Sequence, residues 1–230
     1  MTSRLIKFAA AAAVLLATPF AAIAADMKTP VYKGVPRSVI AYYNWTGFYV
    51  GATVGYGNGS SDWVVPVVGT IATTSPSGMT YGLTAGYNWQ AGSLVYGVET
   101  DYSFSNVKGS VACLAVLTCE VSNTWLATFR GRFGYAFDRF LPYLTAGGAY
   151  GNIKATVSAP LLGTVLEGSE SKFGWTFGAG LEYAFLSNWT AKIEYLYVDL
   201  GTAQPFSQLG GLAQVNFNEH LIRGGLNYRF

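Results

Sequence analysis

The strongest constraint on this chain is a repeated alternation of large apolar residues with glycine and polar residues. In 124–137 and 172–185, every second residue is Trp, Tyr, Phe, Leu, Ala or Gly, and most of these are aromatic. The intervening positions carry mainly glycine, threonine and charged residues. A period of two residues is that of a β-strand, whose side chains point alternately to the two faces of a sheet. These segments therefore predict strands with one apolar face and one polar face.

Eight segments show this pattern, and they predict an all-β fold. The alternation is clear in 94–105, 124–137, 172–185, 189–198 and 219–230, and weaker in 45–57, 78–90 and 142–156. The facing of 142–156 is ambiguous, because Gly147 and Gly148 interrupt its pattern. Each segment is about 10 to 14 residues long, enough to cross a bilayer when tilted.

The predicted connections alternate between short and long. Short turns are expected near 91–93, 138–140 and 187–188, and long loops through 58–77, 106–121, 157–171 and 203–214. Short turns on one rim and long loops on the other are typical of outer-membrane barrels. The predicted fold is an eight-stranded antiparallel up-and-down transmembrane β-barrel. An even number of strands places both ends of the barrel at the short-turn, periplasmic side.

A soluble sandwich or lipocalin-like barrel would also alternate, so the direction of the apolar face decides between the two classes. Aromatic residues make up 16% of the chain and charged residues only 11%, whereas soluble domains carry about 25% charged residues. The interior of an eight-stranded barrel is only just wide enough for side chains. Dense aromatic faces turned inward would overfill it. Turned outward, they contact lipid, with Trp and Tyr at the membrane interfaces.

The first 24 residues predict a secretory signal peptide. Arg4 and Lys7 precede an apolar stretch over 8–20, which is followed by a pattern of small residues at alternate positions. Cleavage is expected after Ala24 or one residue later, and the residues of the cleavage site are Ala22, Ala24 and Ala25. The rival interpretation is a membrane anchor, but the apolar stretch is short for a spanning helix.

The mature chain is then divided into a lead-in and a barrel. Residues 25–44, which contain Pro30 and Pro36, are predicted to be a poorly ordered periplasmic lead-in, and 45–230 form the barrel. Removing 1–24 takes away two of the fourteen basic residues and none of the twelve acidic ones. Positive and negative charges are then equal in number, so no nucleic-acid partner is predicted.

Ten charged residues share the parity of the polar faces and are therefore expected in the lumen, since a charge facing lipid costs about 2–4 kcal/mol at the bilayer midplane. They are Glu99, Asp101, Arg130, Arg132, Lys172, Glu182, Lys192, Glu194, Glu219 and Arg223. Buried charges must pair, and Arg130 and Arg132 are the expected hub. Two interpretations stay open, namely a plug of salt bridges that closes the barrel and a polar lumen that conducts ions.

Several segments resemble one known family. The stretch 44–51, Asn-Trp-Thr-Gly-Phe-Tyr-Val-Gly, resembles the first strand of small alphaproteobacterial outer-membrane β-barrel proteins. Segments 142–151, 192–201 and 226–230 are also similar. That family includes the major surface antigens of Brucella and the hemin-binding proteins of Bartonella, and is related to the transmembrane domain of OmpA. The resemblance implies a location in the outer membrane, in contact with its lipid and lipopolysaccharide.

The C-terminal residue extends this resemblance. Phe230 ends an amphipathic strand and shares a face with Leu226 and Tyr228. Such an ending resembles the signal that the outer-membrane assembly machinery reads, which makes that machinery an expected partner. The alternative is an ordinary aromatic residue of the membrane interface.

Few other residues indicate chemistry. Cys113 and Cys119 are expected to form a disulfide, because exported proteins meet an oxidising compartment, with two free thiols as the alternative. His220 is the only histidine and falls on the lipid-facing parity. Haem binding in some members of the resembling family would make it a ligand, the alternative is an incidental histidine, and it supports no catalytic dyad. No cofactor, metal site or enzymatic activity is predicted. The expected function is a structural, surface-exposed protein that supports envelope integrity. The alternatives are a narrow porin and a receptor for hemin or another ligand.

Overall fold

The computed structural model describes residues 42–65, 69–113, 117–159, 163–205 and 214–230. The predicted signal peptide, its cleavage residues Ala22, Ala24 and Ala25, and most of the predicted lead-in lie outside the described residues. In the described part of the chain, no helix has the length and apolar character needed to cross a membrane.

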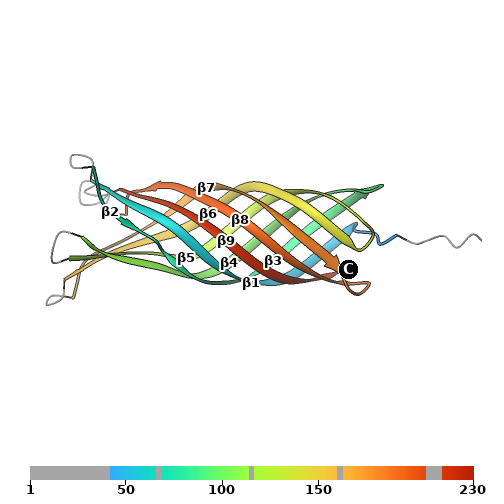
Figure 1. The fold of residues 1–230 in the computed structure, drawn as a ribbon, viewed down its shortest axis with the longest axis horizontal. Coiled ribbons are helices and arrows are strands. Elements are labelled where there is room, and N and C mark those ends of the chain that lie inside the picture. Colours follow the sequence, from blue (N-terminus) through green and yellow to red (C-terminus); the bar gives the residue numbers. More distant parts are fainter. Residues whose placement is uncertain (1–41, 66–68, 114–116, 160–162, 206–213) are drawn as a thin grey trace, which may run out of the picture. The chain divides into compact units, whose positions relative to one another are not determined.

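The described residues form an antiparallel sheet of nine strands. The strands are β1 (Gly47–Val65), β2 (Gly69–Thr74), β3 (Ser77–Ala91), β4 (Leu94–Cys113), β5 (Leu117–Tyr135), β6 (Phe140–Ala159), β7 (Gly163–Ala184), β8 (Trp189–Ala203) and β9 (Gln214–Arg229). From β3 to β9 each strand pairs with the next, and β1 pairs with both β3 and β9, which closes the sheet into a barrel (Figure 1). The prediction of an all-β antiparallel barrel is confirmed.

The strand β2 is an additional element within a segment that was predicted to be a loop. On β1, Asn58 pairs with Ser77 of β3 and Ser61 pairs with Thr74 of β2, so β2 and β3 follow one another along the same side of β1. They are separated at Pro76, whose carbonyl accepts a hydrogen bond from the Gly59 amide at 2.8 Å. Proline lacks the N–H that a regular ladder requires, which explains the break.

The strands are longer than predicted. β4 and β6 each contain 20 residues and β7 contains 22. The predicted loops 58–77, 106–121 and 157–171 are therefore wrong in extent, because much of each belongs to strands, whereas β8 ends and β9 begins at the predicted bounds of the loop 203–214. The short turns are where the sequence placed them, after β3, β5 and β7. We call this end of the barrel the short-turn end and the opposite end the long-loop end.

In the added strand length, the apolar residues move from the outer face to the inner face. On β6, Leu144 and Tyr150 face outward, whereas Ile153 and Val157, farther toward the long-loop end, face inward, and Lys154 lies on the outer face. The long-loop half of the barrel thus encloses an apolar core, as a soluble barrel does. Its fully buried members are Trp63, Val107, Val121, Ala149, Ile153, Ala155, Leu196, Val198, Leu200, Ala203, Val215 and Phe217.

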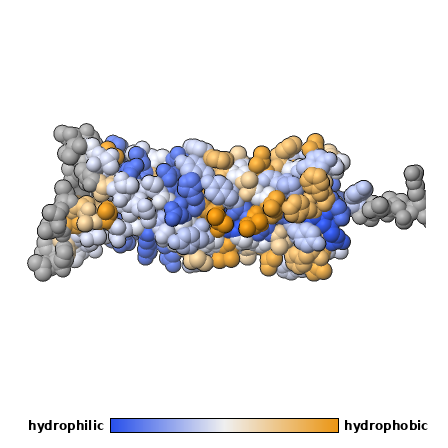
Figure 2. Space-filling model, viewed as in Figure 1, coloured by the Kyte–Doolittle hydropathy of each residue, from blue (hydrophilic) through white to orange (hydrophobic). Residues whose placement is uncertain are grey.

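The outer surface has an apolar belt over the half nearer the short turns. In Figure 2, apolar residues gather toward that end, and hydrophilic residues predominate toward the other. Exposed aromatic residues border the belt on both sides, for example Phe48 and Trp189 at the short-turn end and Tyr81 and Phe104 farther up. An exposed apolar surface of this extent, bordered by aromatic rings, fits contact with lipid.

Candidate functional site

Eight charged side chains lie inside the barrel at the level of the apolar belt. Four are acidic and four are basic, and none is more than 4% exposed. They are Glu99 and Asp101 of β4, Arg130 and Arg132 of β5, Glu182 of β7, Lys192 and Glu194 of β8, and Arg223 of β9. Their formal charges balance. We call this set the lumen network.

Arg130 lies at the centre of the lumen network. Its Nη2 contacts Glu99 Oε1 at 2.5 Å and Asp101 Oδ2 at 2.8 Å, and its Nη1 contacts Glu194 Oε1 at 3.0 Å. Its Nε donates to the Thr128 hydroxyl at 2.9 Å. Glu99 is the direct cross-strand partner of Arg130, whereas Glu194 lies on β8, which does not pair with β5. The Arg130 guanidinium therefore connects two strands, β5 and β8, that are not joined by backbone hydrogen bonds.

Arg223 and Lys192 pair with the same carboxylates from other directions. Arg223 contacts Asp101 Oδ1 at 2.8 Å and Glu194 Oε2 at 2.7 Å. The Lys192 ammonium contacts Glu99 Oε2 at 2.9 Å. Asp101 and Glu194 are thus each shared by two arginines, Arg130 and Arg223. Buried ion pairs are tolerated only when their remaining hydrogen-bonding groups are also satisfied, and here the carboxylate oxygens of Asp101 and Glu194 all have partners.

Arg132 forms the part of the network nearest the short turns. Its Nη2 contacts Glu182 Oε2 at 2.6 Å, and its guanidinium lies over the Tyr143 ring, 3.9 Å from the centroid. Tyr49 accepts a hydrogen bond from Arg132 at 3.0 Å and donates one to Glu99 at 2.7 Å. These contacts join the Glu182 pair to the ion pairs around Arg130.

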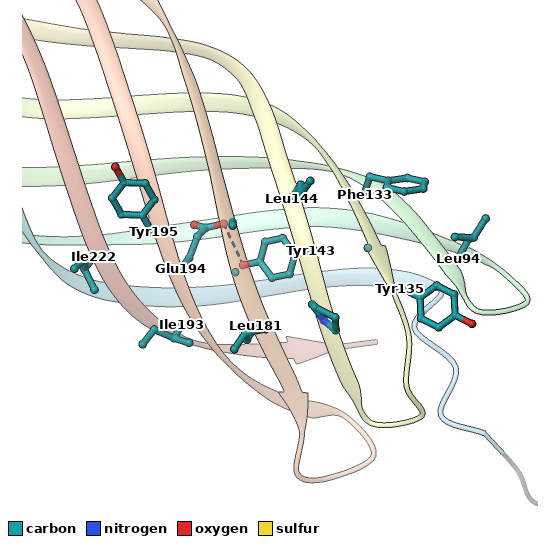
Figure 3. A pocket seen from close by; sticks show the side chains of 14 residues that line it. Leu94, Phe133, Tyr135, Tyr143, Leu144, Leu181, Ile193, Glu194, Tyr195 and Ile222 are labelled. Carbon is teal, nitrogen blue, oxygen red and sulfur yellow. Dashed lines mark hydrogen bonds between the residues drawn. The ribbon is translucent and has the colours of Figure 1, made fainter.

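Tyr143 supplies a second aromatic hydroxyl to the network. Its hydroxyl donates to Glu194 Oε1 at 3.1 Å, and Figure 3 shows the two side chains pointing toward each other. In the same view, Leu144 and Leu181 belong to the outer face, where both are exposed. Because side chains alternate between the two faces of a strand, residues with polar contacts in the lumen are adjacent in sequence to residues that face lipid.

Two inward glycines make room for the tyrosine rings. A Cβ added at Gly86 would lie 2.5 Å from Tyr49 Cζ, and one added at Gly180 would lie 2.5 Å from Tyr143 Cζ. Any larger residue at either position would occupy the space of the ring. The glycine-rich inner faces of the sequence are explained here by this packing of tyrosine against bare backbone.

The prediction of ten paired lumen charges is wrong for two residues. Lys172 has the inward parity but its side chain is 30% exposed, and it pairs at 2.9 Å with Glu170 of its own strand, outside the lumen network. Glu219 is fully buried, yet its one hydrogen bond among the described residues comes from the Asn123 amide at 3.2 Å. Parity fixes the face on which a residue lies, but not its depth along the barrel.

Replacement of Glu219 by glutamine is expected to leave the free energy of unfolding unchanged or to raise it. The substitution removes a charge for which the described residues offer no cation, and an unpaired buried charge is costly. Glu194→Gln is the matched control, because it removes an acid that Arg130 and Arg223 share and leaves the lumen network with one excess buried positive charge, which should cost about 3–5 kcal/mol. Denaturant titrations of the refolded barrels in detergent compare the two. Equal losses would show that Glu219 has a cationic partner.

Apolar layers lie on both sides of the lumen network. Toward the long-loop end is the buried core described above, which includes Cys113 and Cys119, joined by a disulfide and each 3% exposed. Toward the short-turn end is a smaller cluster. Its members are Tyr43, Trp45, Val95, Ala136, Leu141, Tyr143 and Ala184.

This arrangement of an apolar belt around a charge-balanced lumen network can be compared with known proteins. Residues 8–230 match the family described as outer membrane protein beta-barrel domain. The chain belongs to this family. It is 35% identical to the 31 kDa outer-membrane immunogenic protein of Brucella melitensis biotype 1, over 96% of this chain and 98% of the relative.

Two other relatives agree. The 25 kDa outer-membrane immunogenic protein of Brucella abortus biovar 1 is 35% identical, over 93% of this chain and 92% of the relative. The 22 kDa outer membrane protein of Rhizobium leguminosarum bv. viciae is 30% identical, over 81% of this chain and 79% of the relative. The family and its relatives place the chain in the outer membrane, as the sequence analysis predicted.

His220 of this outer membrane barrel lies on the outer face, away from the lumen. Its Nδ1 is 2.7 Å from the Tyr195 hydroxyl, and its ring packs against Tyr197 at 5.1 Å between centroids. Within the described residues, no group of three or more His, Cys, Asp and Glu side chains is arranged to hold a metal ion. The histidine therefore contacts interface tyrosines, and no ligand set surrounds it in the described part of the barrel.

Phe230 lies at the short-turn border of the belt. Its ring is 5.7 Å from Phe48 and 5.1 Å from Tyr228, and its amide donates to the Phe48 carbonyl at 3.0 Å. Leu226 is also exposed on this face. These contacts fit an aromatic residue of the interface, and the role of Leu226, Tyr228 and Phe230 as an assembly signal stays a prediction.

Deletion of Phe230 is expected to lower the amount of barrel assembled in the outer membrane while secretion into the periplasm continues. The reason is that Leu226, Tyr228 and Phe230 are predicted to form the signal for the assembly machinery, and the deletion removes its terminal aromatic residue. Membrane fractionation with gels of boiled and unboiled samples measures assembly, since a folded barrel migrates differently from the unfolded chain. Phe185→Ala, another exposed aromatic of the short-turn end, is the control. Normal assembly of the deletion variant would remove the signal role.

Proposed function

We propose that this chain is a structural, surface-exposed protein of the outer membrane that supports envelope integrity. The observation that carries the proposal is the lumen network, in which four acids and four bases neutralise one another inside the belt. A barrel filled in this way is suited to stability in the membrane. The proposed role is non-catalytic.

The closed interior favours this proposal over a narrow porin. An ion crossing the lumen would have to separate buried pairs such as Arg130–Glu194, and breaking such a pair costs about 3–5 kcal/mol. It would then meet the apolar core of the long-loop half, where Val107, Val121 and Ile153 have no exposed surface. Permeable barrels of this class instead enclose a polar, water-filled channel.

The surface part of the proposal rests on the long-loop end and on the relatives. The Brucella relatives are named as immunogenic outer-membrane proteins, and a protein that elicits an immune response is commonly accessible at a surface. We infer that the long-loop end of this chain contacts the environment of the cell. Its further expected partners are the membrane lipid and lipopolysaccharide around the belt, and the assembly machinery.

A chromosomal deletion tests the proposed function. Cells without the protein are expected to become more sensitive to detergents and to take up more of a hydrophobic dye, because the envelope loses a stabilising component. Restoring the wild-type gene should reverse both effects. A porin predicts a different result, namely unchanged detergent sensitivity with slower uptake of small hydrophilic solutes. That second result would replace the proposal.

A further inference from the structure

The five residues that precede the first strand, 42–46, lie at the short-turn end. Residues 42–44 belong to the lead-in that was predicted to be poorly ordered, and 45–46 were predicted to belong to the barrel. Trp45 is 1% exposed and Tyr43 is 9% exposed. Both belong to the apolar cluster at this end of the barrel, whose wall contributes only Val95, Ala136, Leu141, Tyr143 and Ala184. The rings of Tyr43 and Trp45 therefore fill the space that the wall residues leave empty. We call residues 42–46 the mouth strap.

The mouth strap is hydrogen-bonded to the short-turn ends of three hairpins. The Trp45 amide donates to Gln90 Oε1 at 2.6 Å, at the end of β3. The Trp45 indole donates to the Asp138 carbonyl at 2.9 Å, and the Tyr43 amide donates to Asp138 Oδ1 at 2.8 Å, in the turn after β5. The Tyr43 hydroxyl donates to the Ser187 carbonyl at 3.2 Å, in the turn after β7.

Two arginines complete the anchoring of Tyr43. The Arg229 guanidinium of β9 lies 4.3 Å from the centroid of the Tyr43 ring, and that of Arg139 lies 5.7 Å away. Arg229 also donates to the Ser187 carbonyl at 3.2 Å, the acceptor that Tyr43 uses. Burial raises the pKa of the Tyr43 hydroxyl, against the lowering effect of Arg229. The hydroxyl therefore stays protonated and remains a donor.

The turn after β5, which receives two of these four hydrogen bonds, has an unusual backbone. Asp138 has φ of 54°, and it is the one non-glycine residue with positive φ among those described. An aspartate in the left-handed region is strained relative to glycine. Both its carboxylate and its carbonyl are used by the mouth strap, which gives a physical reason for aspartate at this position.

We propose that the mouth strap is a seal, which closes the short-turn mouth of the barrel and keeps water from the lumen network. Displacing it opens a vestibule that ends at the ion pairs around Arg132. The apolar core of the long-loop half makes no contact with the strap cluster and stays closed. The opened state is therefore a dead-end vestibule and not a channel.

A reporter thiol in the mouth tests this inference. Ala184 faces inward and has no exposed surface, so Ala184→Cys places a thiol beneath the strap, while the two native cysteines are bonded to each other. The refolded mature protein is treated with a water-soluble maleimide. Adding Trp45→Ala to the reporter is expected to raise the labelling rate at least about tenfold, since a closed site reacts only through rare local opening. Tyr42→Ala, at a residue that is 73% exposed, is the matched control and should leave the rate unchanged.

A gentler variant keeps the test decisive if Trp45→Ala does not fold. Asp138→Gly removes the carboxylate that holds Tyr43 but suits the positive φ of the turn, so it should fold and raise the labelling rate by a smaller factor. Equal labelling in the Asp138→Gly and reporter-only proteins would overturn the seal, as would equal labelling with Trp45→Ala. Discrete conductance in a strap variant would overturn the dead-end vestibule. Such conductance in a strap variant would not test the proposed function, because that function depends on the conductance of the intact barrel, which is measured separately.

Discussion

Replacing both Arg130 and Arg132 by alanine is expected to lower the free energy of unfolding by at least about 3–5 kcal/mol, the usual cost of leaving a buried partner unpaired. Arg130 pairs with three acids, Glu99, Asp101 and Glu194, and Arg132 pairs with Glu182. Without them, four buried carboxylates share two cations. Unfolding by guanidinium in detergent, followed by gel migration of unboiled samples, measures the loss.

Two comparisons make that result specific. Phe129→Leu and Phe133→Leu change outward residues of the same strand and keep an apolar contact with lipid, so they should cost far less. Lowering the pH neutralises the stranded carboxylates, so the difference between the double variant and wild type should narrow in acid. A double variant that unfolds like wild type at every pH would mean that these charges are solvated in an open pore.

Alanine at Gly86 or Gly180 is expected to cost about 1–3 kcal/mol, the range for overpacking a filled interior. The added methyl group would meet the ring of Tyr49 or Tyr143 and push its hydroxyl away from Glu99 or Glu194. The same denaturant titration measures the effect. Gly131→Ala is the matched control on the outer face, where the nearest atom to an added Cβ is 3.9 Å away.

A second substitution separates overpacking from backbone effects at Gly180. In a Tyr143→Ala background the ring is gone, so Gly180→Ala should cost little there, and the two changes should be strongly non-additive. Full additivity would mean that the glycine matters for the backbone and not for the tyrosine. The same comparison can be made with Gly86→Ala in a Tyr49→Ala background.

The facing of the strands could be predicted from the sequence because it is a local property. In 172–185, alternation alone places Thr176 and Glu182 inside and Trp175 and Phe177 outside, as in the structure. The contact of Arg130 with Glu194 could not be predicted in this way. It joins strands that do not pair, and depends on the stagger that closes the barrel.

Other features could not be predicted from the sequence, for different physical reasons. The change from outward to inward apolar residues near Ile153 lies within 142–156, where Gly147 and Gly148 interrupt the pattern and leave the facing ambiguous. Glu219 and Lys172 have the predicted parity but lie away from the ion pairs, because depth depends on register. The buried position of Trp45 depends on its contacts with Gln90 at the end of β3 and with Asp138 in the turn after β5, and no local sequence pattern indicates these contacts.

In the proposed function, the lumen network and the apolar layers close this barrel. Planar-bilayer recording of the refolded mature protein tests this closure most directly. The account predicts a baseline without discrete, reproducible conductance steps, in protein whose folding is verified by the different migration of boiled and unboiled samples. Reproducible steps from the intact, folded barrel would contradict it and make the chain a narrow porin.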